Sequence, residues 1–302
     1  MGMGGPREVA RGGEGYPERL ASLERPPHRL FLEGPWSHAG PVVAVVGSRH
    51  ANGDGLDMAR SLATDLVRAG AAVISGLARG VDAAAHEGAL DAGGKSGAVL
   101  GTPLDRTYPR RHAALQRRLA GSLGILSELA PGTAPTRGTF ASRNRLLAAL
   151  ADAVVVVQGR ERSGTLLTAA AAGELGRPVG AIPWDPRELL AEAPLSLIRK
   201  GSATLVRNAN DVLALVPAGG GARPLASEAT ESRGDAESGL ALSGTAARLF
   251  AALRRYPEPL EDAAARCGLP LPEAGAALVV LELAGLAKQV AGGLVQRIRA
   301  GG

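Results

Sequence analysis

The sequence predicts an α/β protein with a doubly wound sheet, followed by a small C-terminal domain of the winged-helix type. Three observations support this fold class. Continuous apolar runs such as Val42-Val43-Ala44-Val45-Val46 are typical of strands buried on both faces of a parallel sheet. Segments of helical length alternate with these runs, as expected for βαβ units. A polar, glycine-rich stretch then separates this pattern from a C-terminal segment with a different periodicity.

Residues 41–216 are expected to form the sheet domain. Residues 1–40 are expected to be an irregular lead-in or cap, because their Tyr-Pro and Pro-Pro steps favour extended chain. The expected strands lie at 42–46, 72–75, 97–100, 124–127, 153–157 and 179–182. The expected helices lie at 56–69, 81–92, 111–119, 146–150 and 165–175. Open α/β sheets bind ligands beyond the carboxyl ends of their strands, so motifs in those loops are the candidates for function.

Residues 217–239 contain few large apolar side chains and are expected to be a flexible linker. Residues 240–302 recover helical periodicity and end in two short strands around Gly292-Gly293, a pattern typical of a hairpin. Three helices plus a hairpin are the parts of a winged helix-turn-helix domain. The expected elements are helices at 242–253, 260–266 and 274–283 and strands at 286–290 and 294–298.

The composition favours a polyanionic partner. The 302 residues carry a net charge of +5 and have a pI of about 10, although a protein of this size can have such a charge merely for solubility. The lone Cys267 excludes a disulfide within the chain and a cysteine-based zinc site. The first residues lack the apolar core of a signal peptide, and no apolar run reaches the ~18 residues of a membrane span. We therefore expect a cytoplasmic protein without a membrane segment.

The most informative stretch is Phe140-Ala141-Ser142-Arg143-Asn144-Arg145. It is predicted to begin the helix at 146–150, where free backbone N–H groups attract anions. Arginine forks match phosphate oxygens, and the ring of Phe140 is a candidate for base stacking. Arg137, in the preceding Pro/Gly loop, is a further candidate. The alternative, with equal weight on these residues alone, is a solvated helix start or one paired with acids.

Two other turns are candidate anion sites. Gly47-Ser48-Arg49 ends the first strand, and Ser163-Gly164-Thr165 opens the helix after the strand at 153–157. The alternatives are an ordinary turn and an ordinary Ser/Thr N-cap. Neither turn has the G-x-G-x-x-G spacing of dinucleotide sites, so no nicotinamide cofactor is expected.

No catalytic residue or metal ligand is assigned. The sequence contains no nucleophile elbow, no paired glutamates placed for hydrolysis and no P-loop. Asp82 and His86 are four residues apart on a predicted helix, but no third ligand is apparent. A carboxylate that stabilises the helix start and its loop is the favoured interpretation of Asp82. A basic cluster with Tyr108 and His112 adds modestly to the case for nucleic acid; its arginines are Arg106, Arg110, Arg111, Arg117 and Arg118.

Taken in order, these motifs resemble the DprA/Smf family of DNA-processing proteins from natural transformation. The resemblance covers nearly the whole chain, and the ordered set is specific although each piece alone is not. The matching pieces are Gly15-Tyr16-Pro17, Val46-Gly47-Ser48-Arg49, SGLARGVDAAAH (75–86), Tyr108-Pro109, Ser127-Glu128, FASRNR (140–145) and SGTLLTAAAA (163–172).

The resemblance implies an extended Rossmann-like domain with a mostly parallel sheet. It also implies a homodimer that binds and protects single-stranded DNA and loads the RecA recombinase on it. Carried over by motif, the residues expected at the DNA-binding pocket are Gly47, Ser48, Arg49, Phe140, Arg143, Asn144, Arg145, Ser163, Gly164 and Thr165, with Lys200 from a later segment.

The chain departs from the family pattern at three places that bear on one edge of the pocket. Gln158 stands where the family usually has glutamate, Gly101-Thr102-Pro103-Leu104-Asp105 lacks a second glycine, and residues 183–195 replace a Pro-Gly and glycine-rich loop. The C-terminal domain resembles the winged helix of many family members.

Two other functions are alternatives for this sequence. One is a phosphoribohydrolase-like enzyme that cleaves nucleoside monophosphates, but such enzymes carry a glutamate where Arg162-Ser163-Gly164-Thr165-Leu166-Leu167-Thr168 has no acid. The other is a DNA-binding regulator acting through the winged helix.

Overall fold

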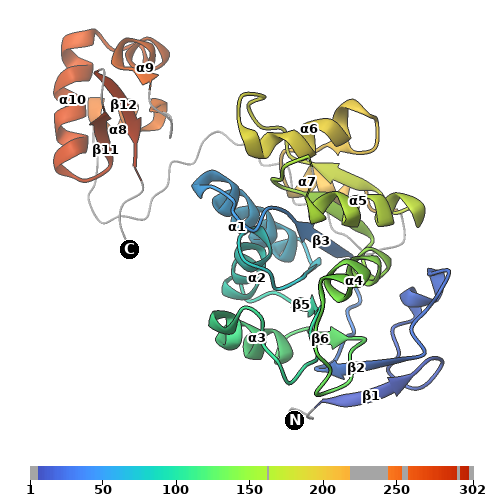
Figure 1. The fold of residues 1–302 in the computed structure, drawn as a ribbon. Coiled ribbons are helices and arrows are strands. Elements are labelled where there is room, and N and C mark those ends of the chain that lie inside the picture. Colours follow the sequence, from blue (N-terminus) through green and yellow to red (C-terminus); the bar gives the residue numbers. More distant parts are fainter. Residues whose placement is uncertain (1–5, 162, 218–243, 254–257, 291–292, 299–302) are drawn as a thin grey trace. The chain divides into compact units, whose positions relative to one another are not determined.

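The computed structural model describes residues 6–161, 163–217, 244–253, 258–290 and 293–298. The chain divides into two compact units, Met1–Leu225 and Ala226–Gly302, and each is described by itself (Figure 1). The predicted linker at 217–239 lies, beyond Pro217, outside the described residues.

The first unit is built on a nine-stranded sheet with the order β1-β2-β6-β5-β4-β3-β7-β8-β9. The seven strands from β6 to β9 in this order are parallel, and β2 and β1 extend one edge in antiparallel fashion. The predicted doubly wound, mostly parallel sheet is confirmed. The strands are β1 (Arg7–Ala10), β2 (Arg29–Glu33), β3 (Val42–Val46), β4 (Ala72–Ser75), β5 (Ser96–Val99), β6 (Gly124–Ser127), β7 (Ala153–Val156), β8 (Val179–Ala181) and β9 (Thr204–Leu205).

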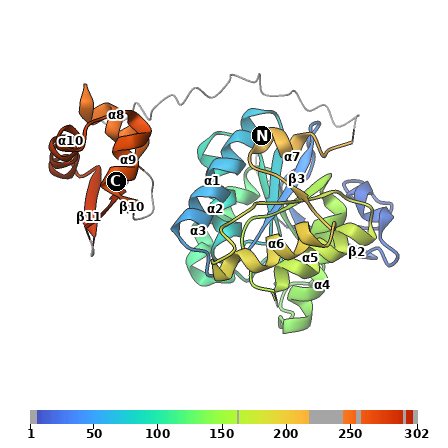
Figure 2. The same ribbon diagram turned by 90° about the horizontal axis from the view of Figure 1, so that it is seen from above.

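The central strands are apolar throughout because both faces of the sheet are covered. Val43 and Val45 of β3 enter one hydrophobic cluster, whereas Ala44 and Val46 enter another on the opposite face. Helices α1 and α2 lie on one side of the sheet and α4 and α5 on the other (Figures 1 and 2). The helices are α1 (Gly53–Arg68), α2 (Val81–Asp91), α3 (Ala113–Ala120), α4 (Arg137–Leu150), α5 (Gly164–Glu174), α6 (Glu192–Arg199) and α7 (Ala209–Leu213), with short 3₁₀ turns η1 (Glu18–Ser22), η2 (Arg110–His112) and η3 (Leu189–Ala191).

The direction of winding reverses between β3 and β7. From β3 the chain moves outward through β4, β5 and β6, and then returns to place β7 on the other side of β3. The loops that follow β3 and β7 therefore diverge and leave a crevice at the carboxyl edge of the sheet. Figures 1 and 2 show β3 in the middle of the sheet, between the two layers of helices.

The expectation that residues 1–40 are an irregular lead-in is wrong, because two strands there join the sheet. β2 pairs with β6, so that Phe31 faces Ser127, and β1 pairs with β2. Leu20 of η1 is fully buried, and Arg19 forms an ion pair with Asp152 at 2.6 Å. These strands are too short to show a clear period, and their pairing with the sheet decides their conformation.

The predicted start of the helix that contains residues 140–145 is also wrong. α4 begins at Arg137, because Thr136 and Thr139 form a reciprocal capping box. Phe140 and the two arginines that follow it thus lie inside the helix. The free N–H groups of the helix start belong to the residues before Phe140, so the helix-terminus argument does not apply to this stretch.

The second unit has the predicted three helices and hairpin. Its core includes Leu249, Leu278 and Val295, and Gly293 adopts a left-handed φ of 73° at the hairpin. A strand that sequence reasoning missed, β10, completes a sheet of order β10-β12-β11. The elements are α8 (Thr245–Ala252), β10 (Glu258–Pro259), α9 (Leu260–Cys267), α10 (Leu271–Leu283), β11 (Ala287–Val290) and β12 (Leu294–Arg297).

Within the described residues, no single helix has the length and apolar character needed to cross a membrane. Only α9 and α10 taken together meet those criteria, and they are bent by 105° at their junction.

A buried histidine ties α2 to the sheet and predicts a pH dependence of stability. Ser96 Oγ donates its proton to Val73 O at 2.9 Å. His86 Nδ1 lies 2.9 Å from Ser96 Oγ, so Nδ1 carries a proton and donates it to that hydroxyl oxygen. Burial, with smaller contributions from His112 and Arg143, lowers the pKa of His86 from 6.5 to about 3.

In the unfolded chain His86 is protonated below its normal pKa, whereas in the folded protein it stays neutral to about pH 3. Its contribution to stability is therefore present above pH 6.5 and is lost as the pH falls. Relative to His86→Gln, the wild type should lose about 2 kcal/mol of unfolding free energy between about pH 7.5 and 5. Urea denaturation of both proteins at the two pH values measures this. Parallel changes in the two proteins would contradict it.

Candidate nucleic-acid interface

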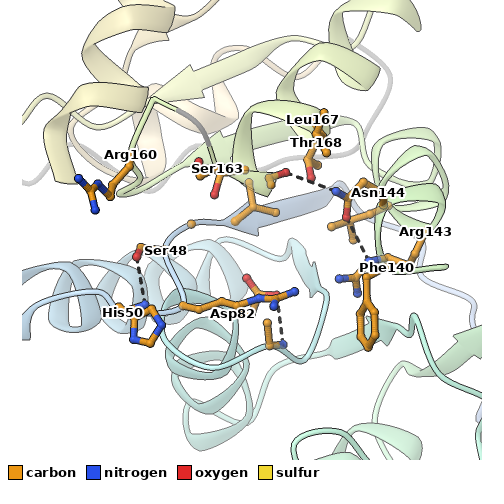
Figure 3. Close-up of a pocket in the computed structure, with 18 residues that line it drawn as sticks. Ser48, His50, Asp82, Phe140, Arg143, Asn144, Arg160, Ser163, Leu167 and Thr168 are labelled. Atoms are coloured by element: carbon orange, nitrogen blue, oxygen red, sulfur yellow. Dashed lines mark hydrogen bonds between the residues drawn. The ribbon is translucent and has the colours of Figure 1, made fainter. Parts of the chain in front are cut away.

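A cavity of about 440 Å³ opens at the carboxyl edge of the sheet, where the loops after β3 and β7 diverge. The loop after β4, the second turn of α4 and the start of α5 complete its walls (Figure 3). Nine of the residues predicted from sequence line this one cavity: Gly47, Ser48, Arg49, Phe140, Arg143, Asn144, Ser163, Gly164 and Thr165. The three separate motifs are thus brought together by the fold.

The loop after β3 is hydrogen-bonded to the segment after β7 on one side and to the start of α2 on the other. Ser48 N donates to Gln158 O at 2.7 Å, and Ser48 O accepts from Val81 N at 3.2 Å. A Cβ atom on Gly47 would lie 2.6 Å from Val81 Cγ2, so only glycine fits. This packing presents Arg49 to solvent, with its guanidinium 5.9 Å from the centroid of the Phe140 ring.

The start of α5 forms the opposite wall. Ser163 occupies the N-cap position but makes no capping hydrogen bond, and its buried Oγ has no partner among the described residues. The first N–H groups of the helix lack intrahelical acceptors, and the helix dipole favours negative charge beside them. Together they form a site suited to an anion.

Arg143 points inward and not toward solvent. Its side chain is buried, with 6% exposure, and its Nη1 donates to Gly76 O at 2.9 Å and to Val99 O. Its Nε donates to Asn144 Oδ1 at 3.2 Å, and Asn144 Nδ2 donates to Gly164 O at 3.3 Å (Figure 3). A Cβ on Gly76 would lie 2.3 Å from the guanidinium. Arg143 therefore holds the loops after β4 and β5 and, through Asn144, the start of α5.

Asp82 is the buried acid beside this arginine. Its Oδ2 accepts from Gly76 N at 3.1 Å and from Ala78 N at 3.2 Å, which confirms the loop-stabilising role preferred from sequence. Burial raises the pKa of Asp82, and Arg143 and the backbone donors oppose that shift. Burial likewise lowers the pKa of Arg143, opposed by Asp82. Each charge thus offsets part of the desolvation of the other.

Two predicted residues, Arg145 and Lys200, lie outside the cavity lining. Arg145 bonds to Glu128 and donates to Arg25 O at 3.1 Å, so its guanidinium has partners within the fold. Lys200 is the exposed C-cap residue of α6. Arg137 is the first residue of α4. A contribution of these three to DNA binding stays a prediction.

Two of the three departures from the family pattern, Gln158 and residues 183–195, leave the cavity open. Gln158 is fully buried, and its amide exchanges hydrogen bonds with Asn52, the N-cap of α1. Trp184 Nε1 donates to Val157 O at 2.6 Å. Neither side chain lines the cavity. The replaced segment, residues 183–195, forms η3 and the first turn of α6.

Sequence reasoning missed His50, Arg160 and Leu167, which also line the cavity. His50 follows the Gly47 turn directly, and Arg160 comes shortly after β7. Position beyond a strand's carboxyl end was the signal that could have found both. No group of His, Cys, Asp or Glu among the described residues is arranged to hold a metal ion.

The fold and the cavity define a class: a doubly wound α/β protein with a cavity at its topological switch point, joined to a winged helix. The family model "DNA recombination-mediator protein A" matches residues 8–217, and that of the "DprA winged helix domain" matches residues 234–293. The chain belongs to the DprA family of DNA-processing proteins.

Relatives match over most of their length. The chain is 38% identical to Protein Smf of Escherichia coli (strain K12), covering 95% of this chain and 76% of the relative. It is 40% identical to DNA processing protein DprA of Streptococcus pneumoniae (strain ATCC BAA-255 / R6), covering 66% and 70%.

Two solved structures share the fold. The X-ray structure of DprA from Streptococcus pneumoniae has a TM-score of 0.66 and 37% identity, covering 70% of this chain and 74% of that one. DNA processing protein A from Helicobacter pylori, in a study of its single-stranded DNA binding mode, has a TM-score of 0.63 and 28% identity, covering 70% and 95%.

The burial of Arg143 predicts that its removal affects folding first. Arg143→Ala should lower the unfolding free energy by about 3 kcal/mol or more, because it leaves two carbonyls without their buried donor and the buried Asp82 without its nearby opposite charge. Arg145→Ala, which breaks a partly exposed pair, should lower it by only about 1 kcal/mol. Urea denaturation of both variants gives the comparison. An Arg143→Ala protein as stable as wild type would show that the guanidinium does not hold the loops.

Proposed function

We propose that this chain binds single-stranded DNA in the cavity, without cleaving it, and holds a backbone phosphate between the start of α5 and the loop after β3. The observation that carries the proposal is the set of donors that converge there. Three kinds of donor suit phosphate oxygens: the N–H groups of the α5 start, the exposed guanidinium of Arg49, and the hydroxyl of Ser163, which has no partner in the described part of the chain.

A single strand fits this site better than a duplex. The Phe140 ring lines the same cavity as the anion site, beside Arg49. Stacking on such a ring requires an unpaired base, and it tolerates any base because every base has a π-face. The study of the Helicobacter pylori relative, which concerns single-stranded DNA binding, supports the same ligand.

The acids of the cavity argue against hydrolysis. Asp82 is the one carboxylate among the described residues that line it, and its Oδ2 already accepts two backbone N–H groups. Both a general acid and a nucleophile for glycosidic cleavage need a carboxyl group that can reach the substrate. A phosphoribohydrolase activity is therefore not proposed.

The second unit argues against the alternative function of a regulator that recognises duplex DNA through its winged helix. Its third helix, α10, carries Glu273 and Glu282 and contains no lysine or arginine. Its exposed face includes Val279, Val280 and Leu283. A recognition helix in the major groove needs donors for bases and phosphates, which this face does not supply.

The larger role that we propose is protection of incoming DNA and delivery to a RecA-type recombinase in the cytoplasm, by a homodimer, during natural transformation. Family membership supports this role. If it holds, the protein should shorten the lag of RecA filament assembly on DNA coated with a single-strand-binding protein, as followed by ATP hydrolysis. An unchanged lag at saturating protein would argue against hand-over while leaving DNA binding intact.

The phosphate contact gives a direct test of the site. Arg49→Ala should weaken binding to oligo-dT and to mixed sequences alike, and should reduce the slope of log affinity against log salt by about 0.7. Arg68→Ala is a matched control, because Arg68 is also exposed but ends α1 at the opposite edge of the sheet. Fluorescence anisotropy at several salt concentrations measures both quantities. Equal affinities and slopes for the two variants would overturn the assignment of Arg49.

A further inference from the structure

A second recess continues the cavity beyond Phe140. It measures about 200 Å³, and its walls include Arg49, His50, Phe140 and Arg143, which also line the first cavity. The walls that it does not share with the first cavity include Arg79 and Tyr108. A strand held at the α5 start can therefore continue into this recess without leaving the surface.

The loop that carries Tyr108 is held from several sides. It connects β5 with η2, and Thr102 Oγ1 donates to Arg106 O at 2.9 Å across its base. Ser127 Oγ donates to Thr102 O at 2.8 Å, and Gln116 Nε2 donates to Leu104 O at 3.1 Å. Thr139 Oγ1 of α4 donates to Gly101 O at 2.8 Å. The loop is thus fixed to α3, α4 and β6, and so is the position of Tyr108.

Tyr108 presents its ring to solvent next to Phe140. It is 58% exposed, and the two ring centroids are 5.5 Å apart with the planes inclined at 57°. The whole sequence contains only three tyrosines, three phenylalanines and two tryptophans. Tyr108 is the one large aromatic among the exposed apolar side chains of the described part of the chain. Packing does not require a ring at this place.

One further cation shares the recess with this ring, and two more are close to it in the sequence. Arg79 lines the same recess, and Arg106 and Arg110 flank Tyr108 in the sequence. All three are exposed, and none forms an ion pair with a carboxylate that the structure describes. Alternating rings and arginines are the pattern of a groove that follows a single strand, with stacking for bases and charge for phosphates.

We propose that Tyr108 is a second base-stacking residue, which binds the nucleotide next to the one at Phe140 and directs the strand toward Arg79. This rests on the proposed function and extends it: the site takes at least two consecutive unpaired bases, and any base suffices. The loop between β5 and η2, which carries Tyr108, thus becomes part of the interface. Of the two rings, only Phe140 belongs to the motif at residues 140–145.

Binding by Tyr108 variants tests the proposal. Tyr108→Ala and Tyr108→Leu should weaken binding of a long oligo-dT by about 5- to 100-fold, whereas Tyr108→Phe and Tyr108→Trp should stay within about 3-fold of wild type. The salt slope should not change in any of them, because no phosphate contact is removed. Arg79→Ala, in contrast, should lower the slope. Thermal denaturation of each variant checks that folding is unaffected.

A spectroscopic readout on the wild-type protein is independent of the stability of any variant. 2-Aminopurine is placed at each position in turn of an oligo-dT just long enough to bind, and its fluorescence falls where the base stacks on a ring. We expect quenching at two adjacent positions in wild type and at one of them in Tyr108→Leu.

The outcomes separate the two proposals. A wild-type protein that binds no single-stranded DNA refutes the proposed function itself. A wild-type protein that binds, with one quenched position that Tyr108→Leu leaves unchanged, refutes only the role of Tyr108. Equal binding by Tyr108→Ala and wild type at every oligonucleotide length would refute it as well.

Discussion

The buried guanidinium of Arg143 is the interaction on which the candidate site depends. It reaches from α4 to the carbonyls of Gly76 and Val99, at the ends of β4 and β5. Through Asn144 the same helix also contacts the first turn of α5. A charge in this position is tolerated because carbonyl oxygens accept its protons and Asp82 lies nearby. One side chain therefore sets the spacing between the loops that form the cavity walls.

The positively charged and N–H donor groups of the site fall into two classes: those that bond within the protein and those that face the cavity. Arg143 and Arg145 have their partners within the protein, and they position other groups. Arg49 is exposed and lines the cavity together with the start of α5, so these groups face the space that a ligand would occupy. A site built on fixed backbone donors needs little reorganisation when an anion arrives, which favours binding without a large loss of conformational entropy. Under the proposed function, such a site selects for phosphate geometry and not for a base.

The switch in strand order explains why such distant segments cooperate. β3 and β7 are neighbours in the sheet although more than a hundred residues separate them in the sequence. Their loops diverge because the chain crosses over in opposite directions from this point, and the first cavity occupies the crevice between them. The second recess extends the same edge toward β5, whose loop carries Tyr108. The proposed nucleic-acid interface therefore follows the carboxyl edge of the sheet.

The sequence by itself determined strands β3 to β8 of the sheet, the three helices and hairpin of the second unit, and the glycine-rich turns. The apolar run Val42–Val46 indicated a strand covered on both faces, and the order of motifs then showed the resemblance to the family. Only the tertiary structure decided where each side chain points. Residues 140–145 read as a uniform basic motif, yet Phe140 and Arg143 reach the cavity whereas Arg145 meets Glu128. Local sequence cannot tell these apart, because burial and pairing depend on neighbours that the fold brings from far along the chain. For the same reason β1 and β2 were missed, and so was the proximity of Tyr108 to Phe140.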